Sequence, residues 1–262
     1  MKIDWRGKAI EVRDIGTGPT VVLVHGYPLD GGMWSGVARV LASEFHVVKP
    51  YLPGRPENPA PPDGKIETYA DFLASIVAAS EGRVGVAGFS MGGYAALALL
   101  RNHPAGISAL ALLDTRASAD DAEGRAKRDE AIAAVETGGP EAVADAMVPK
   151  LLSEAARAKA DVVERVRRTI LRQKPETLKS DLTAMRDRPD QAAFLREIKI
   201  PTLVVAGALD AITPPGPARA MAESIPGARF VEIPEAGHAS PIEKPKAVAA
   251  ALADFFRASL QG

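Results

Sequence analysis

A serine between two glycines is the first feature of the sequence that could do chemistry. The segment Gly88-Phe89-Ser90-Met91-Gly92 follows a short apolar run and precedes a stretch with helical periodicity. A sharp turn from a buried strand into a helix exposes a serine hydroxyl above the sheet, and flanking glycines leave room for that turn. Serine at this position can act as a nucleophile if a general base lies within reach. A purely structural or phosphate-binding turn gives the same local pattern. The assignment therefore depends on whether the chain also supplies a general base and an acid that orients it.

Four histidines are available as the base, and their positions differ. His46 lies in an expected strand, His103 lies at a helix end, and His25 precedes the glycine of a loop, where a backbone role is favoured. His238 lies in the loop 235–241 after the last expected strand. The carboxyl ends of parallel strands share one edge of a sheet, so His238 is the histidine that we expect to reach Ser90.

Two aspartates could orient that histidine, because both follow an expected strand and both lie between Ser90 and His238 in chain order. Asp210 follows the run Thr202 to Ala206, and Asp114 follows the run Ile107 to Leu113. We prefer Asp210, since the loop after the penultimate strand lies beside the loop that carries the histidine. Asp114 is then expected to be structural, or to act as a hinge of the segment that follows it.

Acyl transfer also needs hydrogen-bond donors for the developing oxyanion, and backbone amides are rigid enough for that purpose. The amide of Met91 is the first candidate. The second is the amide of Tyr27, in the loop His25-Gly26-Tyr27-Pro28 after the first central strand. Glycine permits a close approach there and proline stiffens the exit, although a simple tight turn would show the same residues.

Strands alternating with helices are expected to position these groups, and continuous apolar strands indicate a parallel sheet covered on both faces. The sequence therefore predicts an α/β fold with a doubly wound, mostly parallel, eight-stranded sheet. We expect strands at Lys2 to Trp5, Ala9 to Asp14, Thr20 to Val24, Phe45 to Val48, Arg83 to Ala87, Ile107 to Leu113, Thr202 to Ala206 and Ala228 to Ile233, and helices at Met33 to Ser43, Ile66 to Ser80 and Met91 to Asn102.

Residues 115–189 differ in character from the rest of the chain. Strand-like runs are missing there, and amphipathic helical stretches are broken at Thr137-Gly138-Gly139-Pro140 and at Lys174-Pro175. We expect a helical cap inserted after the sixth strand, with residues 1–114 and 190–262 forming the core. Alternatively, these helices simply cover the sheet.

The composition excludes several classes of protein. The 262 residues carry 32 basic and 33 acidic side chains, so neither nucleic acid nor an anionic membrane is an expected partner. The chain has no cysteine, which excludes disulfides and a thiol nucleophile. No histidine-rich motif suggests a metal, and the dinucleotide fingerprint is missing. We expect an untargeted cytoplasmic protein, monomeric or homodimeric, since no long apolar segment is present.

Taken together, the motifs around Tyr27, Ser90, Asp210 and His238 resemble the α/β-hydrolase superfamily over nearly the whole chain. The segment Leu112-Leu113-Asp114-Thr115-Arg116 and the expected cap look like small bacterial carboxylesterases and 3-oxoadipate enol-lactonases. The resemblance implies the α/β-hydrolase fold, the triad inferred above, no cofactor, and a pocket lined by cap side chains. Dehalogenases and epoxide hydrolases of this fold use aspartate where this chain has Ser90.

One loop departs from the superfamily pattern. Such hydrolases usually carry Asp-Leu-x-Gly-x-Gly-x-Ser after the strand that ends here at Val48, whereas this chain reads Tyr51-Leu52-Pro53-Gly54-Arg55-Pro56-Glu57-Asn58. We expect a reshaped loop at the mouth of the pocket.

These features predict a serine hydrolase that cleaves small, short-acyl carboxylic esters through an acyl-enzyme. The alternatives are a 3-oxoadipate enol-lactonase or other lactonase, a cofactor-free perhydrolase or haloperoxidase, and a non-catalytic small-molecule receptor on the same scaffold. The substrate would be a small ester or lactone. Apolar candidates for its pocket are Tyr27, Trp34, Phe89, Met147, Met185 and Ile212.

Overall fold

The computed structural model describes residues 1–58, 60 and 63–260. Its strands are β1 (Lys2–Trp5), β2 (Lys8–Glu11), β3 (Arg13–Ile15), β4 (Thr20–Val24), β5 (His46–Lys49), β6 (Val84–Phe89), β7 (Ile107–Leu113), β8 (Thr202–Gly207) and β9 (Arg229–Ile233). A sheet in the order β3-β5-β4-β6-β7-β8-β9 forms the centre of the molecule, and only the β3–β5 pair is antiparallel. The predicted α/β fold with a mostly parallel sheet is confirmed.

The predicted number of strands in this sheet is wrong. Within the described residues the main sheet has seven strands, and β1 and β2 form a separate two-stranded hairpin. The expected strand from Ala9 to Asp14 is divided at Val12, because β3 leaves the hairpin and pairs with β5. The helical insertion does begin after Ile107–Leu113, but β7 is the fifth strand of the main sheet in chain order, not the sixth.

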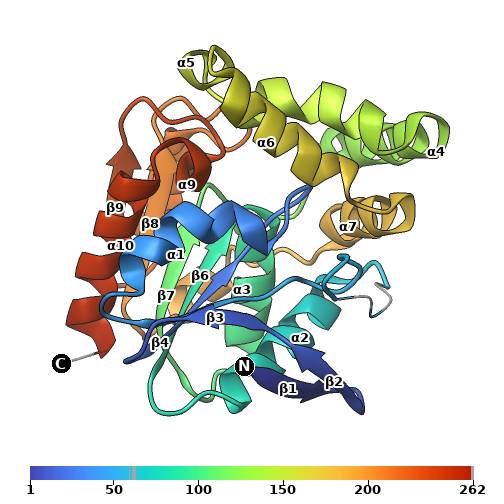
Figure 1. Cartoon of the computed structure of the whole chain (residues 1–262). Helices are drawn as coiled ribbons and strands as arrows, with labels where there is room; N and C mark the ends of the chain where they lie inside the picture. Colours follow the sequence, from blue (N-terminus) through green and yellow to red (C-terminus); the bar gives the residue numbers. More distant parts are fainter. Residues whose placement is uncertain (59, 61–62, 261–262) are drawn as a thin grey trace.

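Helices cover the two faces of the sheet (Figure 1). On one face α2 and α3 pack against each other, and on the other face α1 packs against α10. Every residue of β4 and β6 is buried, as expected for central strands covered on both sides. The helices of the core are η1 (Gly31–Trp34), α1 (Ser35–Leu41), α2 (Ile66–Ala78), α3 (Met91–Asn102), η2 (Phe194–Glu197), α8 (Pro215–Glu223), α9 (Ser240–Glu243) and α10 (Pro245–Leu260).

Four helices between β7 and β8 lie beyond the carboxyl ends of the strands (Figure 1). They are α4 (Ala122–Leu151), α5 (Glu154–Arg157), α6 (Ala160–Leu171) and α7 (Pro175–Asp187). Helix α4 packs against α6 and α7, and it is kinked at Gly139, whose φ of 60° lies outside the helical region. We propose that residues 115–189 act as a cap, because these helices gather at one end of the sheet instead of covering its faces.

A buried ion pair joins this helical layer to the loop that departs from the superfamily pattern. Arg55 donates to both carboxylate oxygens of Asp181 on α7, at 3.0 and 2.6 Å, and neither side chain is exposed. Tyr69 of α2 donates to the same carboxylate at 2.5 Å. Thr177 of α7 donates to the Gly54 carbonyl at 2.8 Å. The loop 51–58 is therefore fixed against α7 through polar contacts.

Candidate active site

Ser90 lies at the turn between β6 and α3, where the backbone adopts a conformation that few side chains tolerate. Its φ and ψ are 51° and −116°, and its amide donates to the Leu113 carbonyl at 2.9 Å. A Cβ atom on Gly92 would lie 2.5 Å from the His25 carbonyl oxygen, which explains why glycine is required there. The local sequence thus holds the serine hydroxyl at the carboxyl end of a central strand.

The structure brings Ser90, His238 and Asp210 together in one hydrogen-bonded row. His238 Nε2 lies 3.0 Å from Ser90 Oγ, and His238 Nδ1 lies 2.8 Å from Asp210 Oδ2. All three residues are buried. Ser90 has the largest exposed fraction of the three, at 8%. The Phe89 ring packs against the imidazole with 5.1 Å between ring centroids. This arrangement lets the imidazole accept a proton from Ser90 while the carboxylate holds its opposite nitrogen.

Asp210 is held in its ionised form by its surroundings. Burial alone would raise its pKa, but the hydrogen bond from His238 and those from Thr213 lower the pKa below its ordinary value. The carboxylate accepts the Thr213 hydroxyl at 2.6 Å, the Thr213 amide at 2.9 Å and the Ile212 amide at 2.8 Å. Sequence reasoning missed Thr213, whose only signal was a hydroxyl side chain three residues after the predicted acid.

Asp114, the competing acid, does not contact the imidazole. It accepts the Gly207 amide at 2.7 Å and the Ser240 hydroxyl at 2.5 Å. Burial, together with the charge of Asp210, raises the pKa of Asp114 well above its ordinary value. Asp114 therefore links the end of β8 to the beginning of α9, two residues after His238.

The two backbone amides predicted as oxyanion donors, those of Tyr27 and Met91, belong to residues close to Ser90. A Cβ atom on Gly26 would lie 2.7 Å from the Phe89 carbonyl oxygen and 2.9 Å from Ser90 Cβ, so the Tyr27 loop passes directly beside the serine. Within the described residues, neither the Tyr27 amide nor the Met91 amide donates a hydrogen bond to another protein group. Both are available to a ligand at this position.

The other three histidines take the places that the sequence suggested. His25 is buried, with Nε2 accepting the Leu52 amide at 3.1 Å and Nδ1 lying 3.2 Å from the Gly26 carbonyl. His46 begins β5 and bonds to Asp14, while His103 ends α3 and bonds to Asp71. None of the three contacts Ser90.

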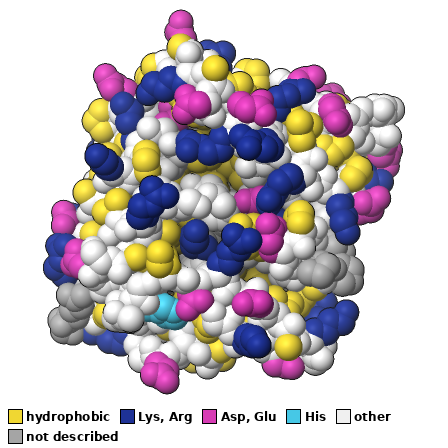
Figure 2. Space-filling view, in the orientation of Figure 1, with side chains coloured by type: hydrophobic (Ala, Val, Ile, Leu, Met, Phe, Trp, Pro, Cys, Tyr) yellow, Lys and Arg dark blue, Asp and Glu magenta, His cyan; other side chains and the backbone are white. Residues whose placement is uncertain are grey.

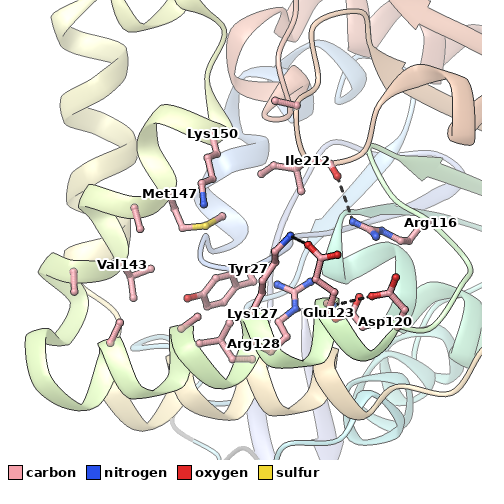
Figure 3. Close-up of a pocket in the computed structure, with 18 residues that line it drawn as sticks. Tyr27, Arg116, Asp120, Glu123, Lys127, Arg128, Val143, Met147, Lys150 and Ile212 are labelled. Carbon is pink, nitrogen blue, oxygen red and sulfur yellow. Dashed lines mark hydrogen bonds and ion pairs between the residues drawn. The ribbon is translucent and has the colours of Figure 1, made fainter.

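A cavity of about 580 Å³ lies between α4 and the loops that contain Tyr27, Arg116 and Ile212 (Figure 3). Three of the predicted pocket residues, Tyr27, Met147 and Ile212, line it. The predicted catalytic residues Ser90 and His238 do not line it. The volume is typical of a small-molecule site.

The predicted pocket residues Trp34, Phe89 and Met185 do not line this cavity. Trp34 and Phe89 pack edge to face, with 6.4 Å between ring centroids and no exposure of either ring. Met185 is also buried in the core. The sequence missed the charged side chains of the cavity, which come mainly from α4.

Two other properties of the described residues bear on the site. No group of three or more His, Asp or Glu side chains in this part of the chain could hold a metal ion. Among the same residues, no helix combines the length and the apolar character that crossing a membrane requires. Figure 2 shows Lys and Arg side chains interspersed with Asp and Glu over the face that it presents.

Comparison with known proteins agrees with this geometry. A family model described as the alpha/beta hydrolase fold matches residues 19–245. The chain is 34% identical over 235 residues to pimeloyl-[acyl-carrier protein] methyl ester esterase of Chromobacterium violaceum, covering 87% of this chain and 90% of that protein.

Two solved structures are also similar. A thermophilic esterase from Thermogutta terrifontis, with malate bound, has a TM-score of 0.93 at 36% identity, covering 99% of this chain and 98% of that one. The enol-lactonase from Burkholderia xenovorans has a TM-score of 0.88 at 26% identity, covering 98% and 99%. The chain belongs to the alpha/beta hydrolase fold family.

Proposed function

We propose that this protein hydrolyses small carboxylic esters through an acyl-enzyme formed on Ser90. The observation that carries the proposal is the hydrogen-bonded row from Ser90 through His238 to Asp210, beside two unpaired backbone amides. The family membership supports it, and so do the two esterases that are at least 34% identical to the chain.

Each step of the reaction has a residue that can perform it. Ser90 Oγ attacks the ester carbonyl carbon while His238 Nε2 takes the hydroxyl proton, and the Tyr27 and Met91 amides donate to the oxyanion. Collapse of the tetrahedral intermediate breaks the bond to the alcohol, which leaves with the proton from His238. Water then attacks the acyl-enzyme with the same histidine as base, the bond between the acyl carbon and Ser90 Oγ breaks, and His238 returns the proton to Ser90. Asp210 keeps the imidazole oriented throughout.

The proposed substrate is an ester with a short acyl chain. The proposed reaction uses no cofactor, because Ser90, His238 and Asp210 supply the nucleophile, the base and the orienting acid. A cavity of about 580 Å³ suits a small substrate. Cytoplasmic location and a monomeric or homodimeric state remain predictions.

The test is the release of p-nitrophenol from acetate, butyrate and octanoate esters by the wild type and by Ser90→Ala. We expect turnover that falls with chain length and that is lost in the variant. Turnover retained by Ser90→Ala would contradict the nucleophile, and a wild type inactive on every ester would favour the non-catalytic receptor.

Lactone hydrolysis is the second candidate, favoured by the similarity to the enol-lactonase. The same residues would open a cyclic ester, with the alcohol remaining attached to the acyl chain. Enol-lactone hydrolysis measured beside the linear esters decides between the two, and addition of peroxide and halide to the assay tests the perhydrolase alternative.

A further inference from the structure

The cavity under α4 contains more charged side chains than a pocket for a neutral ester needs. The basic ones are Arg116, Lys127, Arg128 and Lys150, and the acidic ones are Asp120, Asp121 and Glu123. Arg116 is half-buried, whereas Lys127, Lys150 and Glu123 are exposed, so these charges need no partner within the protein. The pattern of ion pairs therefore shows which charges remain open to a ligand.

All three acids have partners within the protein. Glu123 lies 2.6 Å from Lys127, and Asp121 accepts the Gly124 amide at the beginning of α4. Asp120 lies 3.0 Å from Arg128, and it also pairs with Arg188 behind the cavity wall at 2.8 Å. Lys127 and Arg128 are therefore both paired with an acidic side chain.

Arg116 and Lys150 remain without a carboxylate. Arg116 donates to the Ile212 carbonyl at 3.3 Å, and the described residues place no Asp or Glu within ion-pair distance of either cation. Figure 3 shows Arg116 reaching toward Ile212 from one side, and Lys150 lying above Met147 on the other. The cavity thus carries two positive charges that no acid of the described chain neutralises.

Both cations lie next to segments that are bonded to the proposed catalytic loops. Thr115, which precedes Arg116, donates to the Ser90 carbonyl at 2.7 Å. Leu151, which follows Lys150, accepts the Ala239 amide at 2.8 Å, one residue after His238. Each cation is therefore adjacent in the sequence to a residue that is hydrogen-bonded to the Ser90 turn or to the His238 loop.

Part of the wall of the cavity is apolar. It includes Val143, Met147, Ala211 and Ile212, so it suits a few methylene groups but offers no pairing for a charge. A ligand that matches this surface has a short hydrocarbon part and one anionic group.

We propose that this cavity selects esters that also carry a carboxylate, on either the acid or the alcohol part, and that Arg116 and Lys150 bind that carboxylate. The inference rests on the proposed ester hydrolysis and names its substrate class. Half-esters of short dicarboxylic acids are the simplest members. A planar guanidinium can bind a carboxylate through two hydrogen bonds, and the ammonium adds a second positive charge.

The test compares kcat/KM for the monoethyl esters of succinate and glutarate with kcat/KM for the corresponding neutral ethyl ester amides, in which a carboxamide replaces the free carboxylate. We expect the wild type to prefer the acidic esters. Arg116→Gln and Lys150→Met should each lower the ratio of acidic to neutral kcat/KM by about tenfold or more, the scale of a lost hydrogen bond to a charged group. Lys199→Met is the matched control, because this exposed lysine precedes β8 at the opposite edge of the sheet and its loss changes the net charge equally.

Binding to Ser90→Ala separates failure of this inference from failure of the esterase proposal. Calorimetry should show that glutarate binds Ser90→Ala, and that Arg116→Gln in the same background weakens binding at least tenfold. If the wild type hydrolyses the neutral ethyl ester amides as efficiently as the half-esters, or if Lys199→Met changes the ratio as much as the cavity variants, the inference is wrong and the esterase proposal stands. Inactivity on every ester together with glutarate binding would refute the esterase proposal alone, whereas absence of glutarate binding would refute the carboxylate site.

Discussion

Removal of Arg55 should destabilise the protein severely, because Asp181 would be left as a buried charge. The two side chains form a bidentate ion pair at 3.0 and 2.6 Å with no exposure of either. Burial alone would lower the pKa of Arg55, but the Asp181 carboxylate raises it above its ordinary value, so the guanidinium stays charged. Breaking such a pair by removing one partner costs about 3–5 kcal/mol, a large share of the roughly 5–15 kcal/mol that stabilises a typical domain.

Urea unfolding at about 25 °C, followed by circular dichroism, measures this loss for Arg55→Met, Asp181→Leu and the double variant. We expect each single variant to lose about 3–5 kcal/mol and the double variant to lose much less than their sum, because no unpaired charge remains. Tyr69→Phe is the matched control, since it removes only one hydrogen bond to the carboxylate and should cost about 1.5–3 kcal/mol.

Two results would refute this reasoning. A loss below about 1 kcal/mol for Arg55→Met would mean that Asp181 finds another partner or becomes solvated, as surface pairs do. Additive losses in the double variant would mean that the two side chains contribute independently instead of as an ion pair.

Two further predictions concern the site. Asp210→Asn should lower kcat by about 10³- to 10⁴-fold, because an amide favours the wrong imidazole tautomer; ester kinetics that show less than a tenfold loss would contradict the orienting role. His25 accepts the Leu52 amide, and burial lowers its pKa well below 6.5. Below about pH 6.5 the unfolded chain binds the proton that the folded chain rejects, so this contribution to stability is complete above that pH and shrinks as the pH falls. His25→Asn should therefore lose less thermal stability between about pH 7.5 and 5.5 than the wild type does, and equal losses would count against the neutral ring.

The positions of the row could be predicted because local pattern and topology agree. The bounds of β4, α3 and β7 match the expected ones, since each is a continuous apolar or periodic run between turn residues. Parallel strands bring their carboxyl ends to one edge, so chain order alone places Ser90, Asp210 and His238 close together.

The strand count could not be predicted from alternation. The residues around Val12 alternate in the same way whether they continue the hairpin or change partner. Val12 still pairs with Met1 through reciprocal backbone hydrogen bonds, and the residues after it, in β3, pair with β5, far away in the sequence. Pairing between distant strands has no local signal.

The cavity was also beyond sequence reasoning. Apolar residues near strand ends, such as Trp34 and Met185, were as suitable for a pocket as for the core, and packing placed them in the core. Which side chains of α4 line the cavity depends on how that helix is rotated over the sheet. The pair of Arg55 with Asp181 joins residues 126 positions apart, so no spacing rule could reveal it.

The central claim, that Ser90 is the nucleophile, is tested most directly by covalent trapping. A small organophosphonate that mimics an ester is incubated with the wild type and with Ser90→Ala, and the labelled peptide is identified by mass spectrometry. We predict one adduct per chain, on Ser90, with loss of esterase activity in proportion to labelling, and no adduct on the variant. An adduct on another residue that abolishes activity, or esterase activity that survives complete labelling of Ser90, would contradict the claim.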